Sequence, residues 1–130
     1  MAPLPSHRVL VVEDDDPIRE LIKDVLAEEG FSVITAEDGA KAIQILQRLD
    51  PPQEHFCAIF LDLMLPKVPG IDVLRYLRQQ SDLVPVVAMS ASREHLAQAV
   101  MEGARVAVAK PFKIEEMLVL IAHHCPRQHS

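Results

Sequence analysis

Four short apolar runs of this sequence end on residues that could handle a phosphoryl group. VLVV is followed by Glu13, Asp14 and Asp15, AIFL by Asp62, VVAM by Ser90 and VAVA by Lys110. Carboxylate oxygens are ligands that Mg²⁺ prefers, and both a divalent cation and an ammonium group neutralise phosphoryl oxygens. If the runs are parallel strands of one sheet, their carboxyl ends meet at one edge, where ligands bind. The sequence therefore predicts a single site for a divalent cation and a phosphoryl group.

The spacing of apolar residues predicts an alternation of strands and helices that would form such a sheet. We expect strands at 8–12, 31–35, 58–61, 84–89 and 105–109, and helices at 17–29, 39–48, 71–79, 94–102 and 114–123. These βα units predict a parallel α/β sheet with right-handed crossovers and helices on both faces. The flavodoxin-like strand order 2-1-3-4-5 is the natural arrangement, and it brings Glu13 and Asp14 close to Asp62.

Composition limits the remaining possibilities. With 130 residues, 49% of them hydrophobic, we expect one compact domain over 1–130, with loose ends at 1–6 and 126–130 and a loop at 50–55. The net charge of −6 argues against nucleic-acid binding, which needs a basic stripe. There is neither an apolar stretch long enough to span a membrane nor a signal-peptide core, so we expect a cytoplasmic protein.

The cysteines and histidines show no metal or disulfide pattern. Cys57 and Cys125 lie outside any CxxC spacing, and we expect both to be reduced thiols, one at a strand start and one at the end of the last helix. We interpret His123, His124 and His129 as a polar chain end rather than a metal site.

The segments VLVVEDDDPIRELI, AIFLDLMLPKVPGIDVLRYLR, VPVVAMSAS and AKPF, in this order, resemble the receiver domains of bacterial two-component response regulators over about 8–125. The resemblance implies that Asp62 is the phosphoacceptor. It also implies that Glu13, Asp14 and Asp62 hold Mg²⁺ together with the backbone carbonyl of Met64.

The same resemblance assigns the remaining site residues and the partners. Ser90 is expected to contact the phosphoryl group, Lys110 is the lysine of the family's pattern, and the Lys110–Pro111 bond is cis in such domains. The donor would be a phosphohistidine on a sensor histidine kinase or a histidine phosphotransfer protein, and the output would be a downstream target protein. Such a domain is not an enzyme beyond catalysing its own phosphorylation and slow dephosphorylation.

The residue types fit that chemistry. A carboxylate can attack phosphorus to form an acyl phosphate, and the rest of the catalysis is positioning and charge stabilisation. Crowding Glu13, Asp14 and Asp62 together should raise the proton affinity of at least one carboxyl group when no metal is bound.

The chain departs from the family's pattern near its last strand and beside the phosphoacceptor. Ala107 stands where receivers usually carry an aromatic residue that swings inward on activation, and Arg105 and Val106 replace a common acidic pair. Met64 and Ser92 offer no carboxylate or amide to orient an attacking water, so we expect a long-lived phosphoryl group.

These residues suggest three candidate functions. The leading one is a stand-alone receiver, monomeric or weakly dimeric, that signals by protein–protein contact in a two-component system or phosphorelay. A pseudo-receiver that binds a partner regardless of phosphorylation is the alternative, and Ala107 favours it. A phosphohydrolase of the haloacid dehalogenase type would need a second aspartate where Met64 stands.

Asp15 and Asp16 also have a structural explanation, as the N-cap and acidic first turn of the helix at Pro17. The cognate kinase, pathway and target are not readable from the sequence.

Overall fold

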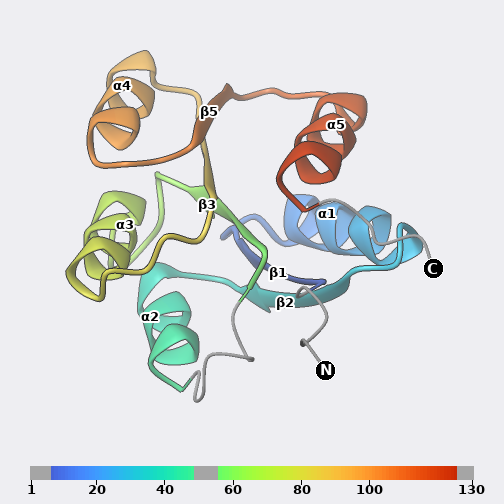
Figure 1. Cartoon of the computed structure of the whole chain (residues 1–130). Helices are drawn as coiled ribbons and strands as arrows, with labels where there is room; N and C mark the ends of the chain where they lie inside the picture. Colours follow the sequence, from blue (N-terminus) through green and yellow to red (C-terminus); the bar gives the residue numbers. More distant parts are fainter. Residues whose placement is uncertain (1–6, 49–55, 126–130) are drawn as a thin grey trace.

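The computed structural model describes residues 7–48 and 56–125; the expected loose ends and the loop expected at 50–55 lie outside these. Strands and helices alternate along the chain (Figure 1). The strands are β1 (Arg8–Val12), β2 (Ser32–Ala36), β3 (Ala58–Asp62), β4 (Val86–Ser90) and β5 (Val106–Ala109). The helices are α1 (Asp16–Glu28), α2 (Gly39–Gln47), α3 (Gly70–Gln79), α4 (Arg93–Met101) and α5 (Ile114–His124). All strand pairs are parallel and the order is β2-β1-β3-β4-β5, which confirms the predicted flavodoxin-like sheet.

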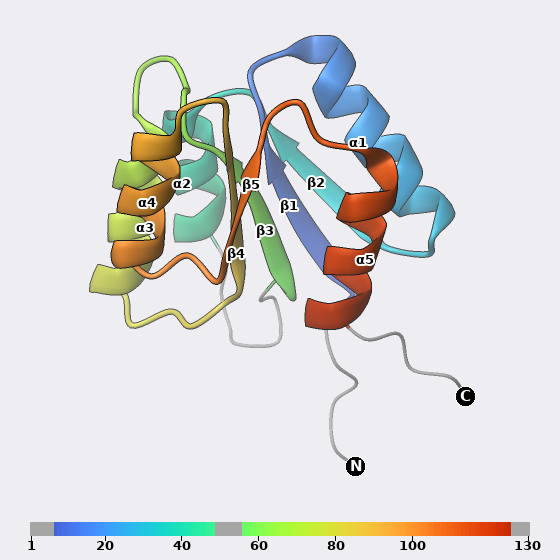
Figure 2. The same ribbon diagram turned by 90° about the horizontal axis from the view of Figure 1, so that it is seen from above.

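Helices cover both faces of the sheet. Figure 2 shows α1 and α5 on one face and α2, α3 and α4 on the other. Successive side chains of a strand point to opposite faces, so Val9 and Val11 pack on the α1 and α5 side while Leu10 and Val12 pack on the other. This double burial explains why the strands read as continuous apolar runs.

Local sequence signals set the helix starts. Asp15 is the N-cap of α1 and accepts a hydrogen bond of 3.0 Å from the backbone N–H of Ile18, while Pro17 occupies the first turn. The capping role weighed for Asp15 is therefore confirmed. Ser92 similarly caps α4, with the His95 N–H 3.3 Å from its hydroxyl oxygen.

Predicted element boundaries differ from the observed ones by a residue or two. The largest difference is at β4, which begins at Val86 rather than at 84. Pro85 lacks an N–H and cannot donate to a strand ladder, although its carbonyl accepts from Ile59 at 3.0 Å. Across the described residues, no helix combines the length and apolar character of a membrane span.

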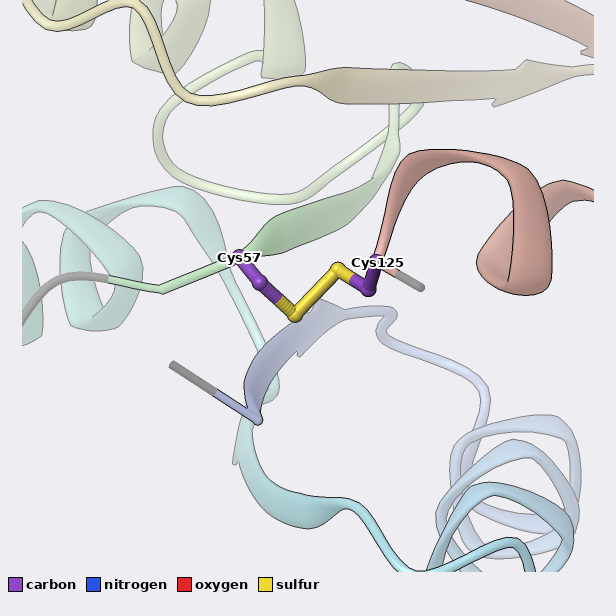
Figure 3. Close-up of a disulfide and its surroundings, with 2 residues drawn as sticks. All are labelled: Cys57 and Cys125. Carbon is purple, nitrogen blue, oxygen red and sulfur yellow. A yellow bond between two sulfur atoms is a disulfide. The ribbon is translucent and has the colours of Figure 1, made fainter. Parts of the chain in front are cut away.

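The expectation of two reduced thiols was wrong, because Cys57 and Cys125 form a disulfide (Figure 3). The residues are 68 positions apart in sequence, yet their Cα atoms lie 5.7 Å apart. In this fold a helix runs back against the strands, so the carboxyl end of α5 reaches the amino end of β3. Sequence spacing alone does not reveal such a meeting of distant element ends.

Candidate functional site

The sheet register brings the predicted site residues to one edge. Val12 pairs with Leu61, Asp62 with Met89, and Ser90 with Ala109, so the residues at and just beyond these positions lie side by side. The carboxyl ends of β1, β3, β4 and β5 thus meet as predicted.

Three carboxylates gather at this edge. Glu13, Asp14 and Asp62 each offer an oxygen atom, and these atoms lie within 4.8 Å of one another. Glu13 and Asp62 are buried, with 0% and 3% of their surface exposed, whereas Asp14 is exposed. Among the described residues, no other group of this kind could hold a metal ion.

The Lys110 ammonium joins the two buried carboxylates. Its Nζ donates to Glu13 Oε1 at 2.6 Å and to Asp62 Oδ2 at 3.1 Å. Burial alone would lower the pKa of Lys110, but the hydrogen bond to Glu13 and the nearby negative charges outweigh it and raise the pKa. Lys110 therefore stays charged between its partners. The bond from Lys110 to Pro111 is cis, as the resemblance implied.

Glu13 holds a proton more tightly than an ordinary glutamate. Burial first, and then the hydrogen bond and negative charge of Asp62, raise the pKa of Glu13 to about 7. The Lys110 hydrogen bond and the Asp15 backbone N–H, which donates to Oε2 at 3.2 Å, act in the opposite direction without cancelling the rise. This matches the expectation that one of the crowded carboxyl groups gains proton affinity.

Ser90 ends β4, the strand beside β3, and Met64 follows Asp62 by two residues. Ser90 is fully buried, and its hydroxyl oxygen accepts a 3.0 Å hydrogen bond from the Ser92 N–H, which leaves the hydroxyl proton available to donate. Its carbonyl accepts from the Lys110 N–H at 2.9 Å. The Met64 N–H donates to Asp62 Oδ1 at 3.0 Å, while its side chain is 56% exposed.

Two residues that support the site were missed by the sequence analysis. Arg19 of α1 donates from Nη1 to the Glu13 carbonyl at 3.0 Å. Gly70 is the first residue of α3 and lies against the backbone of Asp62 and Leu63. A Cβ atom at this position would meet the Asp62 carbonyl oxygen and lie 2.7 Å from the Leu63 Cα. A glycine at the expected start of the helix that follows the Asp62 strand is the sequence signal that could have indicated this close approach.

Ala107 lies apart from this cluster, in the middle of the edge strand β5. It is partly exposed and borders a shallow hollow of about 680 Å³ between β5 and α5. A methyl group has no rotamer to change, so the structure shows no aromatic switch at this position.

Comparisons with known proteins place this geometry in context. The family model of the response regulator receiver domain matches residues 9–122. The alkaline phosphatase synthesis transcriptional regulatory protein SphR of Synechococcus elongatus is 40% identical over 121 residues, which cover 88% of this chain and 47% of that protein. The chain spans about half the length of the curated relatives it matches.

Solved structures agree with this comparison. The receiver domain of the Francisella response regulator 1452 superposes with a TM-score of 0.80 at 30% identity, covering 89% of this chain and 93% of that one. The receiver domain of sensor histidine kinase PA1611 from Pseudomonas aeruginosa PAO1 gives a TM-score of 0.80 at 26% identity, covering 92% of this chain and 97% of that one. That structure has a magnesium ion coordinated in its active site cleft.

Proposed function

Because this chain belongs to the response regulator receiver family, we propose that it accepts a phosphoryl group from a phosphohistidine onto Asp62. The observation that supports this most directly is the Lys110 ammonium, which lies within hydrogen-bond distance of both Asp62 and Glu13. The ammonium supplies a positive charge beside the buried Asp62 carboxylate, where it can stabilise charge on a transferred phosphoryl group.

The donor atoms at the site fit Mg²⁺. Glu13, Asp14 and Asp62 supply carboxylate oxygens from adjacent strand ends, and we assign the Met64 backbone carbonyl as a further ligand. The bound cation would supply neutralisation of the phosphoryl oxygens. Exposure of Asp14 leaves an open side through which a hydrated ion and a donor can approach.

The transfer itself uses the chain's own residues. An Asp62 carboxylate oxygen forms a bond to phosphorus as the bond from phosphorus to the donor's imidazole nitrogen breaks, and that nitrogen keeps the electron pair. Lys110 then holds charge at the phosphoryl group, and the Ser90 hydroxyl donates its proton as a hydrogen bond to a phosphoryl oxygen.

We propose that the partners are a sensor histidine kinase or a histidine phosphotransfer protein on the input side, and a target protein on the output side. We propose a cytoplasmic location for the domain. As an isolated unit, 1–130 would act as one receiver domain that passes its signal by contact rather than by catalysis on a separate substrate.

A pseudo-receiver is the second candidate, and Ala107 is the observation that favours it. Ala107 carries only a methyl group, so phosphorylation of Asp62 cannot change an aromatic rotamer at this position. The surface of β5 and α5 would then not be altered by that route. The domain would then bind its partner through a constant surface.

Amide NMR with Mg²⁺, before and after addition of beryllofluoride, tests both candidates. Beryllofluoride mimics the acyl phosphate, and Asp62→Ala is the control. Shifts that spread from Asp62 through Ser90 to Ala107 and α5 would support a working switch. Shifts limited to the acidic site would favour the pseudo-receiver, and a response retained by Asp62→Ala would refute the phosphoacceptor assignment.

A further inference from the structure

The disulfide ties together two elements that also contribute to the phosphoacceptor site, but at their other ends. Cys57 immediately precedes β3, the strand that ends at Asp62. Cys125 is the C-cap of α5, the helix that follows the Lys110 loop. The bridge and the acidic site therefore lie at opposite ends of β3.

The bridge adds the last contact of the buried face of α5. Met117, Ile121 and Cys125 follow at intervals of four residues and are its buried side chains, each 3% exposed. They pack in the apolar cluster that α5 shares with α1 and the sheet. Met117 and Ile121, with the partly buried Leu120 packed beside them, therefore hold the middle of α5, and a covalent bond holds its end.

The two cysteines differ in accessibility. Cys57 is partly exposed, whereas Cys125 is buried. We take the Cys57 sulfur as the point of attack, because Cys57 is the more exposed residue of the pair. In a reducing cytoplasm, the setting proposed above, protein disulfides are usually transient or redox-sensing.

We propose that the Cys57–Cys125 bridge is a reversible redox site, opened by a dithiol reductant, that controls how firmly the carboxyl end of α5 is held on the sheet. This site operates separately from phosphorylation, because the bridge and the acidic cluster lie at opposite ends of β3. The proposal holds whether or not Asp62 accepts a phosphoryl group.

The reaction is thiol–disulfide exchange. A thiolate of the dithiol attacks the Cys57 sulfur, forms a mixed disulfide, and displaces Cys125 as a thiolate that takes up a proton. The second thiol of the reductant, as a thiolate, attacks the reductant's own sulfur in the mixed disulfide and releases Cys57 as a thiolate, which is also protonated. Two electrons and two protons pass to the cysteine pair, and the reductant leaves as a cyclic disulfide. A disulfide oxidant reverses these steps.

Opening the bridge should have a large and measurable effect. For a separation of 68 residues, the chain-entropy relation predicts that the bond favours the folded over the unfolded chain on the order of 10³-fold. Local opening should increase most in the last turn of α5, where the bridge is the terminal anchor.

The experiment equilibrates the purified chain with mixtures of reduced and oxidised dithiothreitol, and then with reduced and oxidised glutathione. Alkylation and intact mass measurement count the free thiols, and amide hydrogen exchange is followed in both forms. We expect a reversible change between zero and two labelled thiols in the folded protein. We also expect faster exchange at the end of α5 on reduction and an unchanged beryllofluoride response at Asp62.

Cys57→Ser is the matched variant, because it removes the bridge at the partly exposed position and leaves Cys125 in place. It should reproduce the α5 exchange of the reduced form, and this exchange should no longer differ between reduced and oxidised dithiothreitol. Should that variant fail to fold, reduction of the unaltered chain provides the same comparison. A bond that opens only on unfolding, thiols that never pair under oxidised glutathione, or identical α5 exchange in both forms would each overturn the proposal. Loss of the beryllofluoride response on reduction would overturn its independence from the acidic site.

Discussion

Replacement of Gly70 by alanine should displace the backbone of Asp62. The added Cβ would meet the Asp62 carbonyl oxygen and lie 2.7 Å from the Leu63 Cα. Carbon atoms in ordinary contact are about 3.5–4.0 Å apart, so the strand end or the start of α3 must move by roughly 1 Å.

That displacement has a cost in stability and a cost in rate. Overpacking of this kind costs about 1–3 kcal/mol. At about 2.1 cal/mol/K of unfolding entropy per residue over a chain of 130 residues, this lowers the Tm by about 4–11 °C. A shift of about 1 Å in a reacting group can also slow a reaction by about 10²-fold.

Gly39→Ala is the matched control. Its added Cβ would lie 2.8 Å from the Val68 Cβ, a comparable overlap at the start of α2, but Asp62 is not among the atoms it would meet most closely. Thermal unfolding followed by circular dichroism measures the first effect, and phosphorylation by acetyl phosphate followed by intact mass measures the second. Both variants should lose stability, and only Gly70→Ala should lose rate to this extent. Equal rates in the two variants would refute the reasoning.

Three further predictions concern the acidic site. Because the folded-state pKa of Glu13 is raised to about 7, above its ordinary 4.5, the stability contributed by its protonation is complete below pH 4.5 and is lost as the pH rises through 7. Urea unfolding with chelator between pH 4.5 and 8 should show this slope in the parent chain, and Glu13→Gln should flatten it; equal slopes would argue against the raised pKa. Lys110→Met leaves Glu13 and Asp62 facing each other and should lower metal-free stability by about 3–5 kcal/mol. Mg²⁺ should raise the Tm of that variant more than that of the parent. A smaller rise would contradict the inference that Lys110 offsets the negative charges of Glu13 and Asp62. Met64→Asn should speed dephosphorylation by about tenfold or more by orienting water beside Asp62, measured as decay of the phosphorylated mass, and an unchanged decay would remove Met64 as the reason for a long-lived phosphoryl group.

The strand ends that carry chemistry were predictable from the sequence because they obey a general rule. Apolar runs of strand length, separated by helical periodicity, allow few arrangements, and parallel strands must align their carboxyl ends. Glu13, Asp62 and Lys110 therefore meet whatever the details of the loops. Their proximity required no knowledge of side-chain geometry.

Other features depend on where the ends of helices and strands lie relative to one another, and local periodicity does not encode these positions. The Cys57–Cys125 bond depends on the length and tilt of α5, and the role of Gly70 depends on how closely α3 approaches β3. The protonation of Glu13 depends on its complete burial, whereas its neighbour Asp14 is exposed. A sequence shows the two acids as equivalent, and only packing distinguishes them.

The bridge also closes residues 57–125 into a covalent ring. This ring contains Asp62, Ser90 and Lys110, whereas Glu13 and Asp14 lie in the segment that precedes it. One peptide bond cut within the ring of the oxidised protein leaves the fragments covalently joined, so the cut is visible on a gel only after reduction. Even a fully unfolded oxidised chain keeps Asp62, Ser90 and Lys110 within this ring, whereas Glu13 and Asp14, which we propose to bind the metal, remain outside it.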